Sequence, residues 1–215
     1  MLRFIFLVAF AAGICVSAVA ERGYVPPPVG TQVTWVTQTD QGSATRVSEV
    51  VATGPDFAIY LYDLGWDAED ATSFFAEFSG LHMASCAADM PDANERIKLR
   101  SFWPLEAGRS LQIGDEYDST YIVGEAVQHA VSQSEGPKPA RLVTAVVGKS
   151  RTDMMLSLEW NTPVALGWGD GSAVDAIEVF TPSISKSIDE DDRFALGNCA
   201  NLLAGSAAST FVAPN

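Results

Sequence analysis

The sequence is poor in cysteine, histidine and basic residues. Its 215 residues include 3 Cys, 2 His and 13 Lys plus Arg, against 27 Asp plus Glu. Without a basic face, the chain gains nothing from releasing the counterions of a phosphate backbone, so we expect no nucleic-acid partner. No Cys-x-x-Cys pair indicates a redox centre, and no Gly-x-Ser-x-Gly elbow indicates a serine hydrolase. His82 and His129 lack partners at ligand spacing, so we expect no metal and no cofactor, and interpret both as surface or capping histidines.

The chain also lacks an apolar stretch long enough to cross a bilayer comfortably, even at its N-terminus. Arg3 is followed by an uncharged apolar segment over residues 4–16 and by the small-residue pattern Ala18-Val19-Ala20. This order is typical of a secretory signal peptide, predicted here over residues 1–20. An uncleaved anchor, or a lipoprotein modified at Cys15, are the alternatives. The sequence therefore predicts a periplasmic or secreted protein with no transmembrane segment after cleavage.

Removal of residues 1–20 takes away one basic residue and one cysteine. The charged side chains become 13 − 1 = 12 basic and 27 acidic, a formal charge of −15. Such an acidic chain is also repelled by anionic lipid headgroups. Cys86 and Cys199 are left in a compartment that oxidises thiols, which predicts a disulfide between them and a contact between the middle of the chain and its C-terminal part.

Most of the chain has the pattern of short β-strands separated by turns. Residues 21–29 form a Pro-rich, extended lead-in. Apolar and polar residues then largely alternate in two segments joined by turn chemistry, and a third segment follows Gly54-Pro55-Asp56. Further strands are expected after Arg96 and along the rest of the chain. The predicted strands are 31–37, 45–51, 57–62, a segment near 96–99, 111–113, 120–131, 140–147, 154–160 and 173–180.

Two helices are expected to accompany these strands. Asp67 and Asp70 resemble the start of a helix, and Phe74, Phe75 and Phe78 are spaced for one helical face, which predicts a helix over residues 68–79. A short helix capped at Asp189 or Asp191 is expected to carry Cys199. Residues 167–172 are predicted to form a loop, and residues 205–215 a loose tail.

These elements predict a mainly β (α+β) fold: a curved antiparallel sheet, open β-barrel or half-barrel, with one or two covering helices. We expect one β-rich domain over residues 30–204. A similarity of pattern between residues 30–51 and 108–127 raises the alternative of two similar units, 30–94 and 95–182.

Two segments resemble exported bacterial β-rich domains of unassigned function. Residues 102–109 resemble the Trp-Pro-Leu-x-x-Gly opening of such a domain, and residues 158–168 resemble its Trp-x-x-Pro-x-x-Gly close, here with one extra residue before Gly167. The resemblance covers about residues 98–180 and implies a curved antiparallel sheet without catalytic residues. The chain departs from it after Trp168, where Gly169 and Asp170 stand in place of an expected basic residue.

The tryptophans are the strongest candidates for contact with a ligand. Trp35, Trp103 and Trp160 lie within or beside expected strands and favour core packing. Trp66 and Trp168 adjoin glycines in expected loops, where an indole can contact an apolar or sugar ligand. Trp66 and Trp168, together with Trp160 although core packing is favoured for it, are the candidate ligand-binding residues, and no catalytic residue is assigned. Acidic clusters at 170–175 and 189–192 lack the spacing of an EF-hand, so solvated loops or helix starts are favoured over calcium sites.

The favoured function is a non-enzymatic, exported protein that binds an apolar, lipid-like molecule or an envelope protein through its sheet. A lipid binder requires an apolar cavity lined by strand residues, whereas a protein-binding module requires a flat exposed patch or an open edge strand. The alternative is a hydrolytic or carbohydrate-active enzyme, which requires two carboxylates in one cleft, one of them desolvated with a raised pKa.

Overall fold

The computed structural model describes residues 23–39, 42–63, 72–114, 119–131, 136–180 and 196–205. The signal segment over residues 1–20, the candidate Trp66, the expected helix caps Asp189 and Asp191, and the tail after residue 205 lie outside these ranges.

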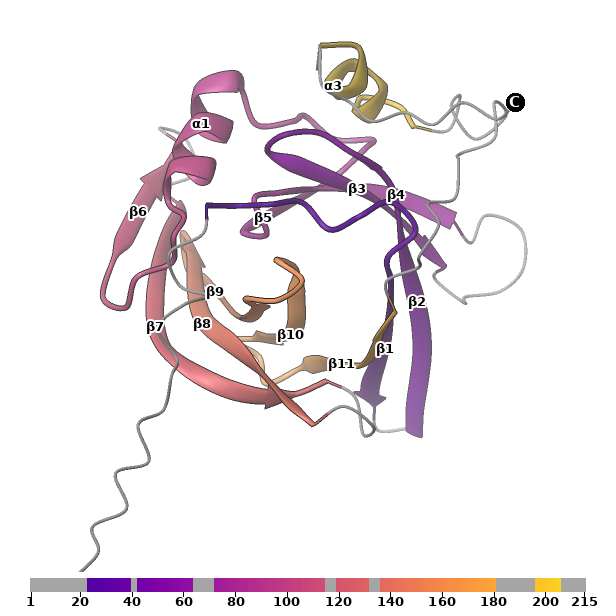
Figure 1. Ribbon diagram of the computed structural model, residues 1–215, viewed down its shortest axis with the longest axis vertical. Helices are drawn as coiled ribbons and strands as arrows, with labels where there is room; N and C mark the ends of the chain where they lie inside the picture. Colours follow the sequence, from indigo (N-terminus) through magenta and orange to yellow (C-terminus); the bar gives the residue numbers. More distant parts are fainter. Residues whose placement is uncertain are drawn as a thin grey trace, which may run out of the picture.

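The described residues form one antiparallel sheet in which two meanders meet (Figure 1). The first meander contains β1 (Gln32–Thr39), β2 (Gly42–Thr53), β3 (Phe57–Asp63), β4 (Thr72–Phe78) and β5 (His82–Ser85). The second contains β6 (Ser110–Ile113), β7 (Ser119–Ala130), β8 (Pro137–Val147), β9 (Ser150–Ser157), β10 (Pro163–Trp168) and β11 (Ala173–Phe180). Strands β1 and β11 pair with each other, which gives the order β5-β4-β3-β2-β1-β11-β10-β9-β8-β7-β6. The predicted mainly β fold with an antiparallel sheet is confirmed.

The sheet curves until side chains from distant strands touch. Tyr60 on β3 shares a hydrogen bond of 2.8 Å with Thr162, in the turn before β10. At the other end, His82 Nδ1 on edge strand β5 lies 2.9 Å from the hydroxyl of Tyr121 on β7. In Figure 1 the strands follow one another around most of a ring, and helix α1 (Ala93–Ser101) lies between β6 and the strands of the first meander. The predicted curved sheet with a covering helix is therefore confirmed.

Strand β3 is buried on both faces. Phe57 and Ile59 point to one face, Ala58 and Tyr60 to the other, and all four are at most 2% exposed. Because every residue of this part of the strand is shielded, the sequence shows a continuous apolar run here. Helix α3 (Cys199–Gly205) lies near β3 and β4 in Figure 1, and its Leu202 packs against the core cluster that contains Phe57.

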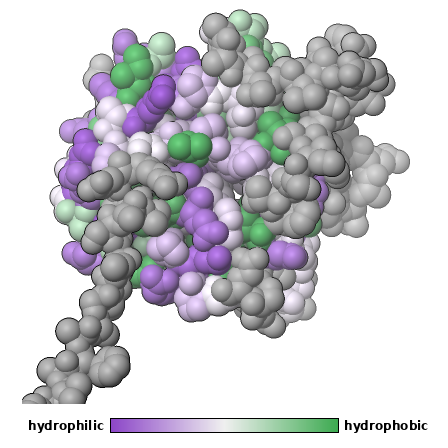
Figure 2. Space-filling model, in the orientation of Figure 1, coloured by the Kyte–Doolittle hydropathy of each residue, from purple (hydrophilic) through white to green (hydrophobic). Residues whose placement is uncertain are grey.

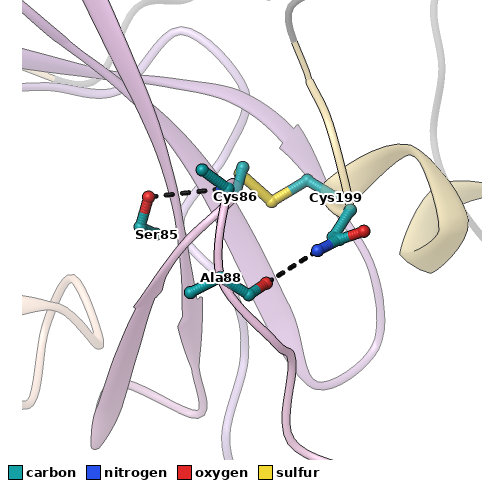
Figure 3. Close-up of a disulfide and its surroundings, with 6 residues drawn as sticks. Ser85, Cys86, Ala88 and Cys199 are labelled. Carbon is teal, nitrogen blue, oxygen red and sulfur yellow. Dashed lines mark hydrogen bonds between the residues drawn. A yellow bond between two sulfur atoms is a disulfide. The ribbon is translucent and has the colours of Figure 1, made fainter.

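The disulfide between Cys86 and Cys199 attaches this C-terminal helix to the end of β5, as predicted (Figure 3). Asn198 strengthens the attachment twice: its backbone N–H donates to the Cys86 carbonyl at 2.8 Å, and its side-chain amide donates to the Ala88 carbonyl at 2.9 Å. Neither helix in the described ranges has the length and apolar character needed to cross a bilayer.

The prediction of a helix over residues 68–79 is wrong for its described part, because residues 72–78 form β4. Phe74, Ala76 and Phe78 are buried on one face, which is the alternation of a strand. They pair with Leu61, Ile59 and Phe57 of β3, respectively. The same phenylalanines also fit a helical spacing, and the pairing with β3 decides between the two patterns.

The prediction of a strand near residues 96–99 is also wrong, because these residues belong to helix α1. Asp92 accepts a hydrogen bond from the N–H of Glu95, and the Glu95 carboxylate accepts one from the N–H of Asp92. This capping box fixes the helix start. Ile97 is 65% exposed while Leu99 is buried, so their alternation with charged residues reflects a mostly solvated helix and not the two faces of a strand.

The segment around Trp160 is divided differently from the prediction. Strand β9 ends at Ser157, whose hydroxyl accepts hydrogen bonds from the N–H groups of Glu159 and Trp160 and so forms a turn. The chain then re-enters the sheet as β10, a strand that the sequence analysis did not assign. Gly167 and Trp168, predicted to be in a loop, are its last residues, and the turn itself begins at Gly169.

Candidate functional site

The candidate site is the concave face of the sheet, where side chains from both meanders converge. Residues directly opposite each other in an antiparallel pair share a face. Trp35 lies opposite Arg46, Tyr60 opposite Phe75, and Leu166 opposite Val174. The register therefore places aromatic and aliphatic side chains of both meanders on the same inner surface.

An outer cavity of about 200 Å³ opens on this surface. Every residue that lines it belongs to a strand, and the strands are β1 to β5, β10 and β11. Two lining side chains, Met83 and Trp168, are 46% and 41% exposed and mark the mouth. Arg46 brings a positive charge to a lining that is otherwise apolar, aromatic or hydroxylic. The full lining is Trp35, Thr37, Arg46, Tyr62, Phe75, Met83, Leu166, Trp168 and Val174.

A smaller inner cavity of about 30 Å³ adjoins the outer one. The two cavities share the side chains of Trp35, Tyr62, Met83 and Leu166, so they are neighbouring parts of one recess. The inner part differs because its lining also contains a carboxyl group and an imidazole. Its further lining residues are Tyr60, Glu77, Gly80, Leu81, His82, Met154, Thr162 and Pro163.

Glu77 is the unusual group of the inner cavity, because it is a carboxyl only 4% exposed among apolar neighbours. The Thr162 hydroxyl lies 3.4 Å from Glu77 Oε2 and can donate to it. Glu77 Oε1 is buried and has no hydrogen-bond partner among the described residues. Burial raises the pKa of Glu77 to about 8, and the hydrogen bond from Thr162 lowers it only in part.

The tyrosines near Glu77 are affected in the same direction. Burial raises the pKa of Tyr24, Tyr60 and Tyr62, and the negative charge of an ionised Glu77 raises each further. Burial also lowers the pKa of His82, which favours its neutral form. The inner cavity therefore holds groups that are uncharged at neutral pH, and this fits an apolar occupant.

The three tryptophans proposed from the sequence lie in different places. Trp168 lines the mouth of the outer cavity. Trp160 packs partly buried against the core cluster of Val33 and Val164, with the Lys138 ammonium 5.8 Å from its ring centre, and it lines neither cavity. Trp66 lies outside the described residues. Trp35 and Trp103, expected in the core, are 7% and 8% exposed, and Trp35 contributes to the lining of both cavities.

The sequence analysis did not name Glu77, Tyr62, Phe75 or Met83 as candidate site residues. The one available signal was the acid inside the apolar run Phe74-Phe75-Ala76-Glu77-Phe78. Interpreted as a helix, this run places Glu77 on a solvated face. Interpreted as a strand, it places Glu77 beside Phe75, and this shared face then requires an explanation.

The carboxylate-dependent enzyme requires a second acid beside the desolvated one. Glu77 meets the first condition, but no second carboxylate among the described residues contributes to its pKa. Within the same residues, no group of three His, Cys, Asp or Glu side chains is arranged to hold a metal ion. Asp170, a candidate calcium ligand, accepts hydrogen bonds from the N–H and hydroxyl of Ser172, and these lower its pKa.

A larger recess of about 410 Å³ lies away from the concave face, among the turn before β3, α1 and α3. Its charged groups include Asp56 and Arg96, which form an ion pair at 3.7 Å. Because these charges satisfy each other and the lining is mixed, this recess is a weaker candidate for an apolar ligand than the concave face.

Comparisons with known proteins find no family model and no curated protein that matches this chain. Solved structures do match. MucB in complex with MucA(peri) is 12% identical with a TM-score of 0.35, and the match covers 81% of this chain and 54% of that one. The Pseudomonas aeruginosa MucA/MucB complex is 12% identical with a TM-score of 0.32, and the match covers 81% of this chain and 56% of that one. PNGF-II is 10% identical with a TM-score of 0.39, and the match covers 75% of this chain and 29% of that one.

The chain thus spans about half the length of the MucB chains and less than a third of PNGF-II.

Proposed function

We propose that this protein is exported, is not an enzyme, and binds an apolar, acyl-chain-like molecule on the concave face of its sheet. The observation that carries the proposal is the outer cavity, which is lined entirely by strand residues, most of them aromatic or aliphatic, with Thr37 and Arg46 as the polar members. A concave apolar site with few polar groups is the usual form of a small-molecule pocket. The Cys86–Cys199 disulfide supports an oxidising location, periplasmic or secreted.

A protein partner is less favoured by the described surface. The edge strands β5 and β6 have only four residues each, which offers a short template for an added strand. The exposed apolar strand residues Ile122 and Val127 on β7 and Val147 on β8 are not direct partners in the sheet. In the view of Figure 2, hydrophobic residues form small separate groups among hydrophilic ones. The described residues on this face therefore form no broad apolar patch of the kind that marks a docking interface.

The proposal is tested by titrating the exported, purified protein with N-phenyl-1-naphthylamine, which fluoresces strongly in apolar sites. We expect saturable binding by the natural protein. Trp168→Ala removes an indole from the mouth of the cavity and should weaken binding about tenfold, equivalent to ~1.4 kcal/mol. Ile122→Ala truncates an apolar side chain of similar exposure (44%) that lines neither cavity, and it should leave the affinity unchanged.

Two results would contradict the proposal. One is the absence of saturable binding by the natural protein. The other is an equal loss of affinity in Trp168→Ala and Ile122→Ala, which would place the dye on a general apolar surface.

A further inference from the structure

The inner cavity gives the recess a polar end of defined size. A volume of about 30 Å³ has room for a group the size of one water molecule. The outer cavity, about 200 Å³, is suited to a hydrocarbon. Because the two share four lining side chains, one elongated ligand can fill both, with a single small polar group at its inner end.

The hydrogen bonds around Thr162 determine which polar group fits there. The Thr162 hydroxyl has one proton, and it lies 2.8 Å from the Tyr60 hydroxyl and 3.4 Å from Glu77 Oε2. When Thr162 donates to Glu77, Tyr60 must donate to Thr162. Both hydroxyl donors, of Tyr60 and Thr162, therefore point toward Glu77, and Glu77 Oε2 is the oxygen that accepts.

Glu77 Oε1 is then the unsatisfied atom at the end of this series of hydrogen bonds. It is buried and has no hydrogen-bond partner among the described residues. At neutral pH the carboxyl holds its proton, because burial raises its pKa to about 8. With Oε2 accepting from Thr162, the proton belongs on Oε1, where it is a buried donor that requires an acceptor.

We propose that the ligand is a linear apolar molecule ending in a neutral oxygen, of the long-chain alcohol or aldehyde class, and that this oxygen accepts a hydrogen bond from Glu77 Oε1. The hydrocarbon lies in the outer cavity against Trp35, Phe75 and Leu166. This assignment rests on the proposed function and adds the chemical class of the ligand.

Other head groups fit the inner cavity less well. A carboxylate would bring a negative charge into an apolar enclosure beside the Glu77 carboxyl, whose own ionisation is already disfavoured there. An ammonium would have to lose its water shell and would require Glu77 to ionise in a buried site. A neutral oxygen needs neither change and satisfies the free donor.

The first arm of the test measures competition of 1-octanol and of nonane, which has the same number of heavy atoms, against N-phenyl-1-naphthylamine. Glu77→Leu removes the donor while keeping a side chain of similar size, and Glu77→Gln keeps a donor in neutral form. We expect Glu77→Leu to weaken the binding of 1-octanol at least tenfold and to leave the binding of nonane nearly unchanged. Glu77→Gln should retain the affinity for 1-octanol. Octanoate and octylammonium should compete less well than 1-octanol in the natural protein.

The second arm uses pH and does not depend on the folding of Glu77→Leu. Raising the pH from about 7 to about 9.5 ionises Glu77 and removes its donor, so octanal, whose oxygen accepts hydrogen bonds but cannot donate one to the carboxylate, should bind the natural protein more weakly. Glu77→Gln should show no such loss. The tyrosines near Glu77 keep their protons in this range because their pKa values are raised, and His82 stays neutral because its pKa is lowered. Arg46 lines the outer cavity and not the inner one.

Different results refute the assigned ligand class and the apolar site. If the dye and nonane bind but 1-octanol is unaffected by Glu77→Leu and octanal is unaffected by pH, water occupies the inner cavity and the assigned ligand class is wrong, while the apolar site stands. If octylammonium is the best competitor, Glu77 is a counter-ion and the assignment is also wrong. If neither dye nor nonane binds, the proposed function itself is refuted.

Discussion

Replacing Glu77 by Gln should change how the stability of this protein depends on pH. In the folded protein the pKa of Glu77 is raised from 4.5 to about 8 by burial, and unfolding returns the carboxyl to water. The folded state therefore holds the proton more tightly than the unfolded state does. The stability that this proton provides is complete below pH 4.5 and is lost as the pH rises through 8.

The size of the effect follows from the two pKa values. At about 1.4 kcal/mol per pKa unit, the difference between 4.5 and about 8 corresponds to a total of about 5 kcal/mol. Between about pH 5 and about pH 9, the contribution of Glu77 to the free energy of unfolding should fall by about 4 kcal/mol. Gln has a similar shape and no charge to titrate, so its contribution should stay constant over the same range.

The assay is urea-induced unfolding, followed by tryptophan fluorescence, at several pH values between about 5 and about 9. Subtracting the curve of Glu77→Gln from that of the natural protein removes the groups common to both. Glu125→Gln, at an exposed position on β7, is the matched control and should follow the natural protein. A constant offset between the natural protein and Glu77→Gln at all pH values would contradict a raised pKa in the folded state, because it would mean that Glu77 titrates alike in the folded and unfolded states.

Three further changes test the attachments around the sheet. The double variant Cys86→Ser/Cys199→Ser opens a loop of 113 residues and should lower the free energy of unfolding by about 4 to 5 kcal/mol in urea titrations, whereas an unchanged midpoint would exclude a stabilising role. Asp92→Ala removes the N-cap of α1 and should cost about 1 kcal/mol, while Asp89→Ala, outside the helix, should cost much less; equal effects would argue against the capping box. Gly197→Ala should lower the melting temperature, because Gly197 has φ +49° and a Cβ there would lie 2.7 Å from the Cys86 carbonyl oxygen; an unchanged melting temperature would show that the turn relaxes freely.

Much of the fold follows from local patterns in the sequence. The alternation predicts strands over residues 31–37 and 45–51, which identify most of β1 and the middle of β2, and the predicted strand 173–180 matches β11. The disulfide follows from the two cysteines that remain after the predicted removal of residues 1–20. These features depend on neighbouring residues or on simple counting, so the sequence alone suffices.

The errors occur where two periods fit the same residues. Phe74, Phe75 and Phe78 satisfy both a helix and a strand, and only the pairing of β4 with β3 selects the strand. The alternation of Ile97 and Leu99 with charged residues suggested a strand, although the Asp92–Glu95 capping box was visible in the sequence and marks a helix start. In this case a local signal outweighed the apparent alternation.

The site was only partly predictable because it forms through long-range curvature. The position of Trp168 beside a glycine was a usable signal in the sequence, and Trp168 does line the mouth of the outer cavity. Glu77 and Thr162, separated by 85 residues, come together only when β4 meets the turn before β10. No sequence pattern within either segment indicates the other.

The most direct test of the account is methyl NMR of the protein with ¹³C-labelled methionine, titrated with 1-octanol. Met83 lies at the mouth of the recess and Met154 at its inner part, whereas Met90 lines the mixed recess beside α1 and Met155 packs against the core cluster of Val33. Binding on the concave face predicts saturable shifts of the Met83 and Met154 methyl signals with little change at Met90. Shifts confined to Met90, or equal small shifts at all four methyl groups, would contradict the central claim.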